Sequence, residues 1–163
     1  MSDAGCLEID ISIESDDWLQ VRELEPRITA AINAAAHHAA IALRKGAEVS
    51  VLLTDDATVK ALNRNWRKQD KPTNVLSFPA SAPAGLGTAP MLGDIAMAFE
   101  TVAREALADG KTLDDHLVHL VVHGFLHLVG FDHLHDAQAE IMENHERMIL
   151  ASLGISDPYA ENP

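Results

Sequence analysis

Hydrophobic and polar residues follow two different periods along the chain. Between residues 7 and 13 they alternate, which predicts a strand with one buried and one exposed face. Short apolar stretches at 49–53, 74–78 and 91–99 predict three further strands. Cys6 is interpreted as a residue of the first strand.

Longer stretches repeat apolar residues at the spacing of an α-helix. They predict five helices, at 24–44, from N-cap candidates at 54–56 to 66, at 100–108, at 112–129 and at 136–153. Strands and helices occur in mixed order, so the expected fold class is α+β with a four-stranded mixed sheet and about five helices.

Capping residues mark the expected helix ends. Gly46 and Gly130 are expected to stop the first and fourth helices, and Thr112 with Asp115 resembles a capping box. Asp136 is expected to cap the last helix. Two segments lack such signals. Residues 80–90, rich in Pro, Gly and Ala, predict a mobile surface loop, and residues 155–163 predict a frayed tail.

The composition is that of one globular domain spanning 1–163, with 47% hydrophobic and 23% charged residues. A single cysteine excludes an intrachain disulfide and favours a reducing, cytoplasmic location. No basic segment precedes an apolar one at the N-terminus, so we expect no secretory signal. The most apolar window, 117–131, contains three histidines and is too short for a bilayer, so we expect no membrane partner.

The charge is strongly acidic, with 25 Asp and Glu against 12 Lys and Arg and a net charge of −13. This balance argues against nonspecific binding to DNA, other nucleic acid or anionic lipid. Basic residues cluster in only one region, at Lys60, Arg64, Arg67, Lys68 and Lys71. Any contact with a polyanion is therefore expected to run through residues 60–71.

Four histidines, at positions 116, 119, 123 and 127, share one stripe of the fourth predicted helix. His123 and His127 are one turn apart and can share an ion, and His133 follows after Gly130 turns the chain back. Three imidazoles with an open position are the ligand set of a catalytic zinc ion. His135 is the competing third ligand, and the spacing favours His133.

The spacing HxxxHxxGxxH also occurs in zinc peptidases of the metzincin kind, in which a Glu follows the first His. Here that residue is Gly124, so the usual general base of peptide hydrolysis is missing. Asp132, Asp94 and Glu146 are conceivable substitutes, although the sequence does not place them against the metal. Asp132 either orients an imidazole or caps the turn, and Asp94 is interpreted as a structural hydrogen-bonding residue.

Three blocks of sequence resemble the YbeY family of bacterial metal-dependent endoribonucleases, which are ribosomal RNA maturation factors. They are NRNWRKQDKPTNVLSFP at 63–79, LGDI at 92–95 and HGFLHLVGFDH at 123–133, and the resemblance covers about 49–150. It implies that His123, His127 and His133 bind the metal and that Arg67 acts in catalysis. It also implies a small α+β domain with the zinc helix beside a four-stranded sheet. The loop at 80–90 and the acidic N-terminal region follow no motif of the family.

The leading hypothesis is a zinc-dependent, single-strand-specific endoribonuclease that acts in ribosomal RNA maturation and ribosome quality control. One Zn²⁺ per chain would activate water or polarise a phosphate oxygen, and the planar fork of Arg67 would stabilise charge on the phosphate. The expected partners are RNA, the ribosome and a ribosomal or assembly-factor protein. The alternatives are a zinc peptidase and a non-catalytic ribosome assembly factor stabilised by its metal. Nickel and copper compete with zinc as the native metal, and the general base stays open.

Overall fold

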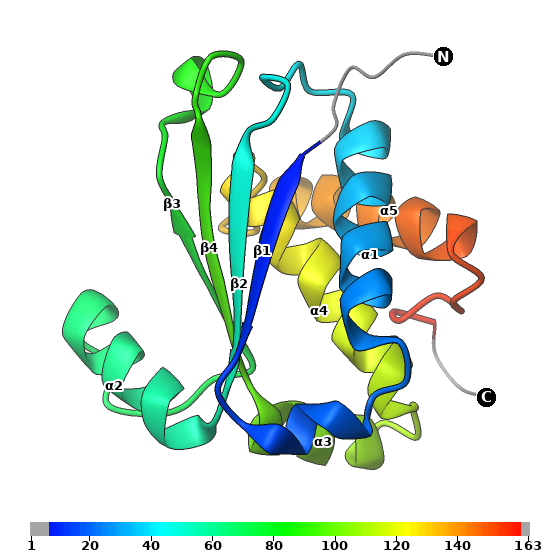
Figure 1. The fold of residues 1–163 in the computed structure, drawn as a ribbon. Coiled ribbons are helices and arrows are strands. Elements are labelled where there is room, and N and C mark those ends of the chain that lie inside the picture. The colour runs from blue at the N-terminus through cyan, green and yellow to red at the C-terminus, as the bar shows by residue number, and fades with distance from the viewer. Residues whose placement is uncertain (1–6, 161–163) are drawn as a thin grey trace.

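The computed structural model describes residues 7–160, which form one domain with five α-helices around a single sheet (Figure 1). The strands are β1 (Glu8–Ile13), β2 (Glu48–Thr54), β3 (Val75–Pro79) and β4 (Met91–Ala98). The helices are α1 (Leu24–Ala39), α2 (Asp56–Arg67), α3 (Phe99–Ala108), α4 (Leu113–Leu128) and α5 (Asp136–Ser152). Two short 3-10 helices lie at Asp16–Gln20 and Pro83–Gly85.

The sheet has the strand order β1-β2-β4-β3 and is mixed. β1 and β4 both run parallel to β2, whereas β3 runs antiparallel to β4 at one edge. The predicted α+β class with a four-stranded mixed sheet is therefore confirmed. Helices α1, α3, α4 and α5 lie on one side of the sheet, and α2 projects from the other (Figure 1).

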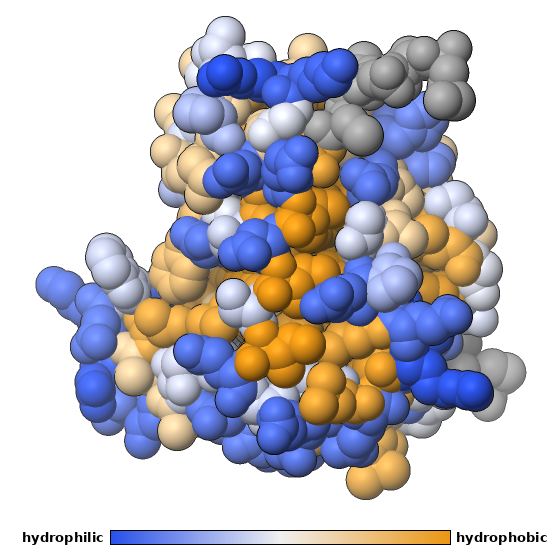
Figure 2. Space-filling model, in the orientation of Figure 1, coloured by the Kyte–Doolittle hydropathy of each residue, from blue (hydrophilic) through white to orange (hydrophobic). Residues whose placement is uncertain are grey.

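Side-chain alternation in the strands explains this layering. In β1 the isoleucines are partly buried against the core while the residues between them are exposed, as the period of two predicts. In β2, Val49, Val51 and Leu53 are buried on the side of α4 and α1. Because β1 is an edge strand, its apolar side chains remain half-exposed. On the face of the molecule seen in Figure 2, apolar residues gather over the middle and hydrophilic residues surround them.

Helix α4 lies at the centre of the core and packs against β3 and β4. Thr112 begins the helix, because its Oγ1 accepts a hydrogen bond from the backbone N–H of Asp115 at 3.1 Å. Gly130 follows its end with a φ of +102°, a conformation that favours glycine. Both predicted ends of this helix, and its place beside the sheet, are confirmed. Among the described residues, no helix combines the length and apolarity needed to cross a membrane.

Two predicted helix ends differ from the structure. α1 ends at Ala39 with Ala40 in the left-handed conformation, well before Gly46. The residues that follow include Ile41 and Leu43, which pack against the core from an irregular segment instead of continuing the helix. Asp136 does not cap α5, since it is the first helical residue and no side chain caps that end. In this position its carboxylate still interacts favourably with the helix dipole.

The two segments without capping signals are more structured than predicted. The loop at 80–90 contains a 3-10 turn, and Leu86 anchors it in the core with 3% of its surface exposed. The segment after Gly154 returns to α4 and α5 through Tyr159 instead of fraying. Cys6 and residues 161–163 of the predicted tail lie outside the described residues.

Candidate metal centre

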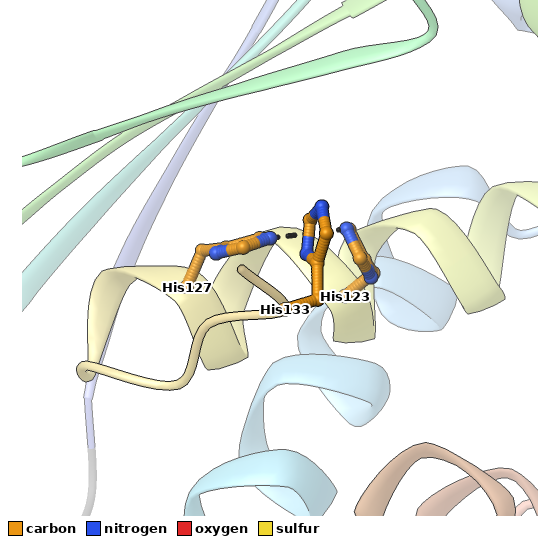
Figure 3. Close-up of side chains that lie close together, drawn as sticks. All are labelled: His123, His127 and His133. Atoms are coloured by element: carbon orange, nitrogen blue, oxygen red, sulfur yellow. Dashed lines mark hydrogen bonds between the residues drawn. The ribbon is translucent and has the colours of Figure 1, made fainter. Parts of the chain in front are cut away.

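Three histidine side chains converge at the C-terminal end of α4. His123 and His127 lie on successive turns of the helix, and His133 lies in the loop that leads to α5 (Figure 3). One ring nitrogen from each residue lies within 4.8 Å of the other two. The Nε2 atoms of His123 and His127 are 3.2 Å apart. Two nitrogens bound tetrahedrally at roughly 2 Å from one ion would be about 3.3 Å apart. The triad could therefore hold a metal ion with little movement.

The loop after α4 brings the third histidine back towards the helix. Its first turn is closed by hydrogen bonds from the Gly130 N–H to the His127 carbonyl, 3.1 Å, and from the Phe131 N–H to the Leu126 carbonyl, 3.0 Å. Asp132 then accepts a hydrogen bond from the backbone N–H of His133 at 2.7 Å. Of its two predicted roles, the structure therefore places Asp132 in the turn.

His135, the competing third ligand, occupies the N-cap position of α5 and is exposed. Within residues 7–160, the only cluster of histidines, cysteines and carboxylates that could hold a metal contains His133 and not His135. The direction in which the chain leaves the loop explains the difference, because His135 already belongs to the start of the next helix.

His127 is in its neutral form near neutral pH. Burial, together with the nearby His123 and His133, lowers the pKa of His127 to about 4. A neutral imidazole is the form that binds a metal ion, so His127 would release no proton on binding. The neutral ring therefore has a lone pair that a metal ion can use without competition from a proton.

Glu146 lies directly behind the triad on α5, with only 1% of its surface exposed. Its Oε1 atom is 3.2 Å from Nδ1 of His123 and 2.8 Å from Nε2 of His119. The hydroxyl of Tyr159 donates to the same carboxylate. Burial alone would raise the pKa of Glu146, but the hydrogen bonds from His119 and His123 outweigh it and lower the pKa to about 2. As a conceivable substitute base, Glu146 is thus ionised, enclosed and already engaged by donors.

The rest of the histidine stripe is buried and also paired with carboxylates. His116 contacts Glu105 at 2.9 Å, and Glu105 in turn accepts a hydrogen bond from Asn74 at 3.0 Å. Burial lowers the pKa of His116 against the opposing effect of Glu105. His116 and His119 are therefore enclosed beneath the surface and form no exposed polar stripe.

A cavity of about 660 Å³ opens beside the triad. It is lined by the three histidines, by Ser77 of β3, by Asp132 and by Arg67 at the end of α2. Within residues 7–160 Arg67 takes part in none of the salt bridges, whereas its neighbour Arg64 is 3.8 Å from Asp70. The cavity thus combines a metal-binding arrangement with an available guanidinium group.

Asp94 lies elsewhere. It lines a separate groove of about 490 Å³ together with Asp10 of β1 and Trp66 of α2. Helix α2 lies on the side of the sheet away from α4 (Figure 1). The structure therefore does not bring Asp94 to the triad as a substitute base. Its neighbour Gly93 has a φ of +143°, and a Cβ there would collide with the carbonyl oxygen of Phe78.

Sequence reasoning missed the part played by Tyr159, and it considered Glu146 only as a base. The signal for Glu146 is its position in the apolar stripe of α5, among the buried Met142, Ile149 and Leu150. A carboxylate at such a position is rarely buried unless donors satisfy it. No comparable signal marks Tyr159, because its partners come from two helices.

The sequence and fold match known proteins over most of their length. Residues 10–154 match the family described as Endoribonuclease YbeY. A protein named Endoribonuclease YbeY from Azorhizobium caulinodans is 54% identical over 155 residues, which cover 94% of this chain and 97% of the relative. One of the same name from Rhodopseudomonas palustris is 56% identical, with 93% and 92% covered. The solution structure of TM1509 from Thermotoga maritima is similar in fold, with a TM-score of 0.52, 22% identity, and 95% and 99% of the two chains covered.

Proposed function

The chain belongs to the endoribonuclease YbeY family, and from this premise we propose that it is a zinc-dependent endoribonuclease that cleaves single-stranded RNA. Its expected substrate is ribosomal RNA during maturation and quality control of the ribosome. The observation that supports this most directly is the shared cavity, in which His123, His127 and His133 lie with Arg67.

The three imidazoles fit a zinc ion by donor type, number and spacing. When bound, zinc supplies a Lewis acid and lowers the pKa of a coordinated water molecule. His123, His127 and His133 would supply three ligands of a tetrahedral zinc ion, which would leave one position for water or substrate. The neutral state of His127 favours metal binding at the pH of the cytoplasm, where we place the protein.

Arg67 is the residue that we assign to the phosphate. Its guanidinium can donate two parallel hydrogen bonds to phosphate oxygens, and its charge would stabilise the negative charge that develops there during cleavage. Within residues 7–160 no salt bridge competes for it, so the group is free to meet a substrate that enters the cavity. The polar side chains of Thr73, Asn74 and Ser77 line the approach.

The surface charge suggests how RNA arrives. The net charge of −13 opposes binding of free RNA, while the basic residues of 60–71 are all exposed along α2 and in the following loop. A protein with this charge distribution would bind naked RNA weakly, and it would do so through residues 60–71. We therefore infer that the ribosome, with a ribosomal or assembly-factor protein, delivers the substrate.

The decisive experiment compares the purified parent with His123→Ala and with His135→Ala as a matched control. We expect one zinc ion per parent chain by elemental analysis, cleavage of single-stranded RNA and no hydrolysis of a generic peptide. His123→Ala should lose metal and cleavage, and His135→Ala should retain both. RNA cleavage that persists in metal-free His123→Ala would contradict the proposal. A folded, zinc-bound parent that cleaves no RNA would favour the assembly-factor alternative.

A further inference from the structure

A buried chain of polar contacts connects the segment after α5 to the metal-binding histidines. It runs from Tyr159 to Glu146 and from Glu146 to both His119 and His123. Glu146 is 1% exposed and His119 is 9% exposed. Burying a carboxylate in an apolar helix interface is costly unless donors surround it, so this arrangement needs a structural or functional reason.

The contact with His123 determines which ring nitrogen carries the proton. Nδ1 of His123 is 3.2 Å from Oε1 of Glu146, whereas Nε2 points towards the triad and lies 3.2 Å from Nε2 of His127. An ionised carboxylate only accepts hydrogen bonds, so the hydrogen bond requires a proton on Nδ1. The lone pair is then on Nε2, on the side of the triad, where a metal ion needs it.

Glu146 is itself held in place from two sides. His119 Nε2 lies 2.8 Å from Oε1, and the Tyr159 hydroxyl lies 3.0 Å from each carboxylate oxygen. The Tyr159 ring also meets the His119 ring edge to face, with 5.5 Å between centroids. With His123, three side chains fix the rotation of this carboxylate, so its position does not depend on solvent.

Tyr159 is fixed by a second set of contacts at the surface of α5. Its backbone N–H donates to Asp157 at 2.8 Å, and Asp157 pairs with Arg147 at 3.2 Å. The Arg147 guanidinium lies over the Tyr159 ring, 5.3 Å from its centroid. Lys111, before α4, approaches the Pro158 carbonyl at 3.5 Å. The segment 155–160 thus contacts α5 and the residues before α4, in addition to His119 of α4.

We propose that Glu146 is a positioning residue for the metal centre and that Tyr159 holds it, so that the segment after α5 tunes metal affinity from outside the ligand set. The inference rests on the proposed function insofar as the triad binds zinc. Glu146 would act by preorganising the His123 ring for metal binding. With Glu146 in place, His123 presents the correct nitrogen in the correct direction before the ion arrives, and without it the ring can rotate or change tautomer.

The test measures the zinc dissociation constant by competition with a chromophoric chelator. Glu146→Gln keeps the size of the side chain and removes its charge, and Tyr159→Phe removes one hydroxyl. Partners of metal ligands typically contribute roughly 10- to 100-fold to affinity, so we expect a loss of about that size for Glu146→Gln and a smaller one for Tyr159→Phe. Glu140→Gln, at an exposed position of the same helix, is the matched control and should bind as the parent does.

A second readout reports the tautomer itself. In the metal-free parent, ¹⁵N NMR of the His123 ring should show the proton on Nδ1, and Glu146→Gln should shift the ring towards a mixture of tautomers. Circular dichroism and thermal unfolding of the metal-free variants separate this effect from loss of fold. If Glu146→Gln does not fold, Tyr159→Phe and the parent spectrum still decide the question.

Two results would overturn the inference while leaving the proposed function standing. One is a folded Glu146→Gln variant with the parent's zinc affinity. The other is a metal-free parent in which His123 carries its proton on Nε2. A parent that binds no zinc at all would instead remove both the proposed function and the inference.

Discussion

Ser77 donates a hydrogen bond from its hydroxyl to the backbone carbonyl of Gly124, at 3.0 Å, and so joins β3 to α4 one residue after His123. A Cβ at Gly124 would lie 3.2 Å from Ser77 Oγ and from Ile95 Cγ2, and 3.3 Å from Val75 Cγ2. The sheet therefore occupies the space that a side chain at this position would need. This contact gives a structural reason why the glutamate of metzincin-type peptidases has no counterpart here.

Gly124→Glu should destabilise the protein and should not produce a peptidase. The substitution overpacks the contact between helix and sheet and buries a charge, and we expect a loss of about 3 kcal/mol or more in the free energy of unfolding. Denaturant unfolding measures it, with Gly124→Ala as the graded comparison. For Gly124→Ala, a cost of about 1–3 kcal/mol for crowding is partly offset by about 1 kcal/mol of helix propensity. Unchanged stability of the Glu variant would show that the sheet can move away.

Arg67→Ala should leave the zinc content unchanged and slow RNA cleavage. Removing one donor that stabilises developing charge typically costs roughly 100-fold or more, and we expect a loss of that order in the single-turnover rate. Arg64→Ala is the control, since Arg64 is exposed, pairs with Asp70 and does not line the cavity. Its rate at saturating RNA should equal that of the parent. If Arg67→Ala cleaves as fast as the parent, the role assigned to Arg67 is wrong.

Binding of naked single-stranded RNA should be weak and should fall steeply with salt. Each phosphate contact contributes a slope of about −0.7 to the dependence of log affinity on log salt concentration. Lys71→Ala should reduce that slope by about one such contact, whereas Lys45→Ala, an exposed lysine outside the basic cluster, should not change it. Fluorescence anisotropy over a salt series measures both. Equal effects of the two variants would argue against an RNA contact through residues 60–71.

The metal-free protein should lose stability as the pH falls from about 6.5 towards about 4. Burial lowers the pKa of both His116 and His127, the latter to about 4. Between these pH values the two histidines are therefore protonated in the unfolded chain and neutral in the folded protein. Because the unfolded chain binds more protons, its population grows on acidification. Glu146 adds little to this pH dependence above about pH 5. Because its pKa is lowered, its contribution to stability is complete there and is lost only at more acidic pH.

The measurement is denaturant unfolding in chelator at about pH 7 and about pH 5, for the parent and His127→Gln. The parent should be less stable at the lower pH. In His127→Gln the difference in the free energy of unfolding between the two pH values should be smaller, and the part that remains should come from His116. A parent whose stability is unchanged or higher at the lower pH would contradict the buried, neutral state of His127.

Contacts between residues close in sequence were within reach of sequence reasoning. The histidines of α4 share a face because of helical periodicity, and a glycine three residues after His127 returns the chain so that His133 joins them. The Thr112 cap and the alternation of β1 are equally local. The end of α1 could not be predicted from local sequence, because Ile41 and Leu43 pack against the core from outside the helix.

The amino-acid sequence alone determined the α+β class, the central helix and the meeting of His123 with His127 and His133, because local backbone geometry governs each of them. Only the tertiary structure decided that Arg67 faces the same cavity, that Gly124 is pressed against Ser77, and that Glu146 and Tyr159 stand behind His123. These contacts join residues far apart in the chain. They depend on which faces of the helices and the sheet pack together, and no short spacing encodes that choice.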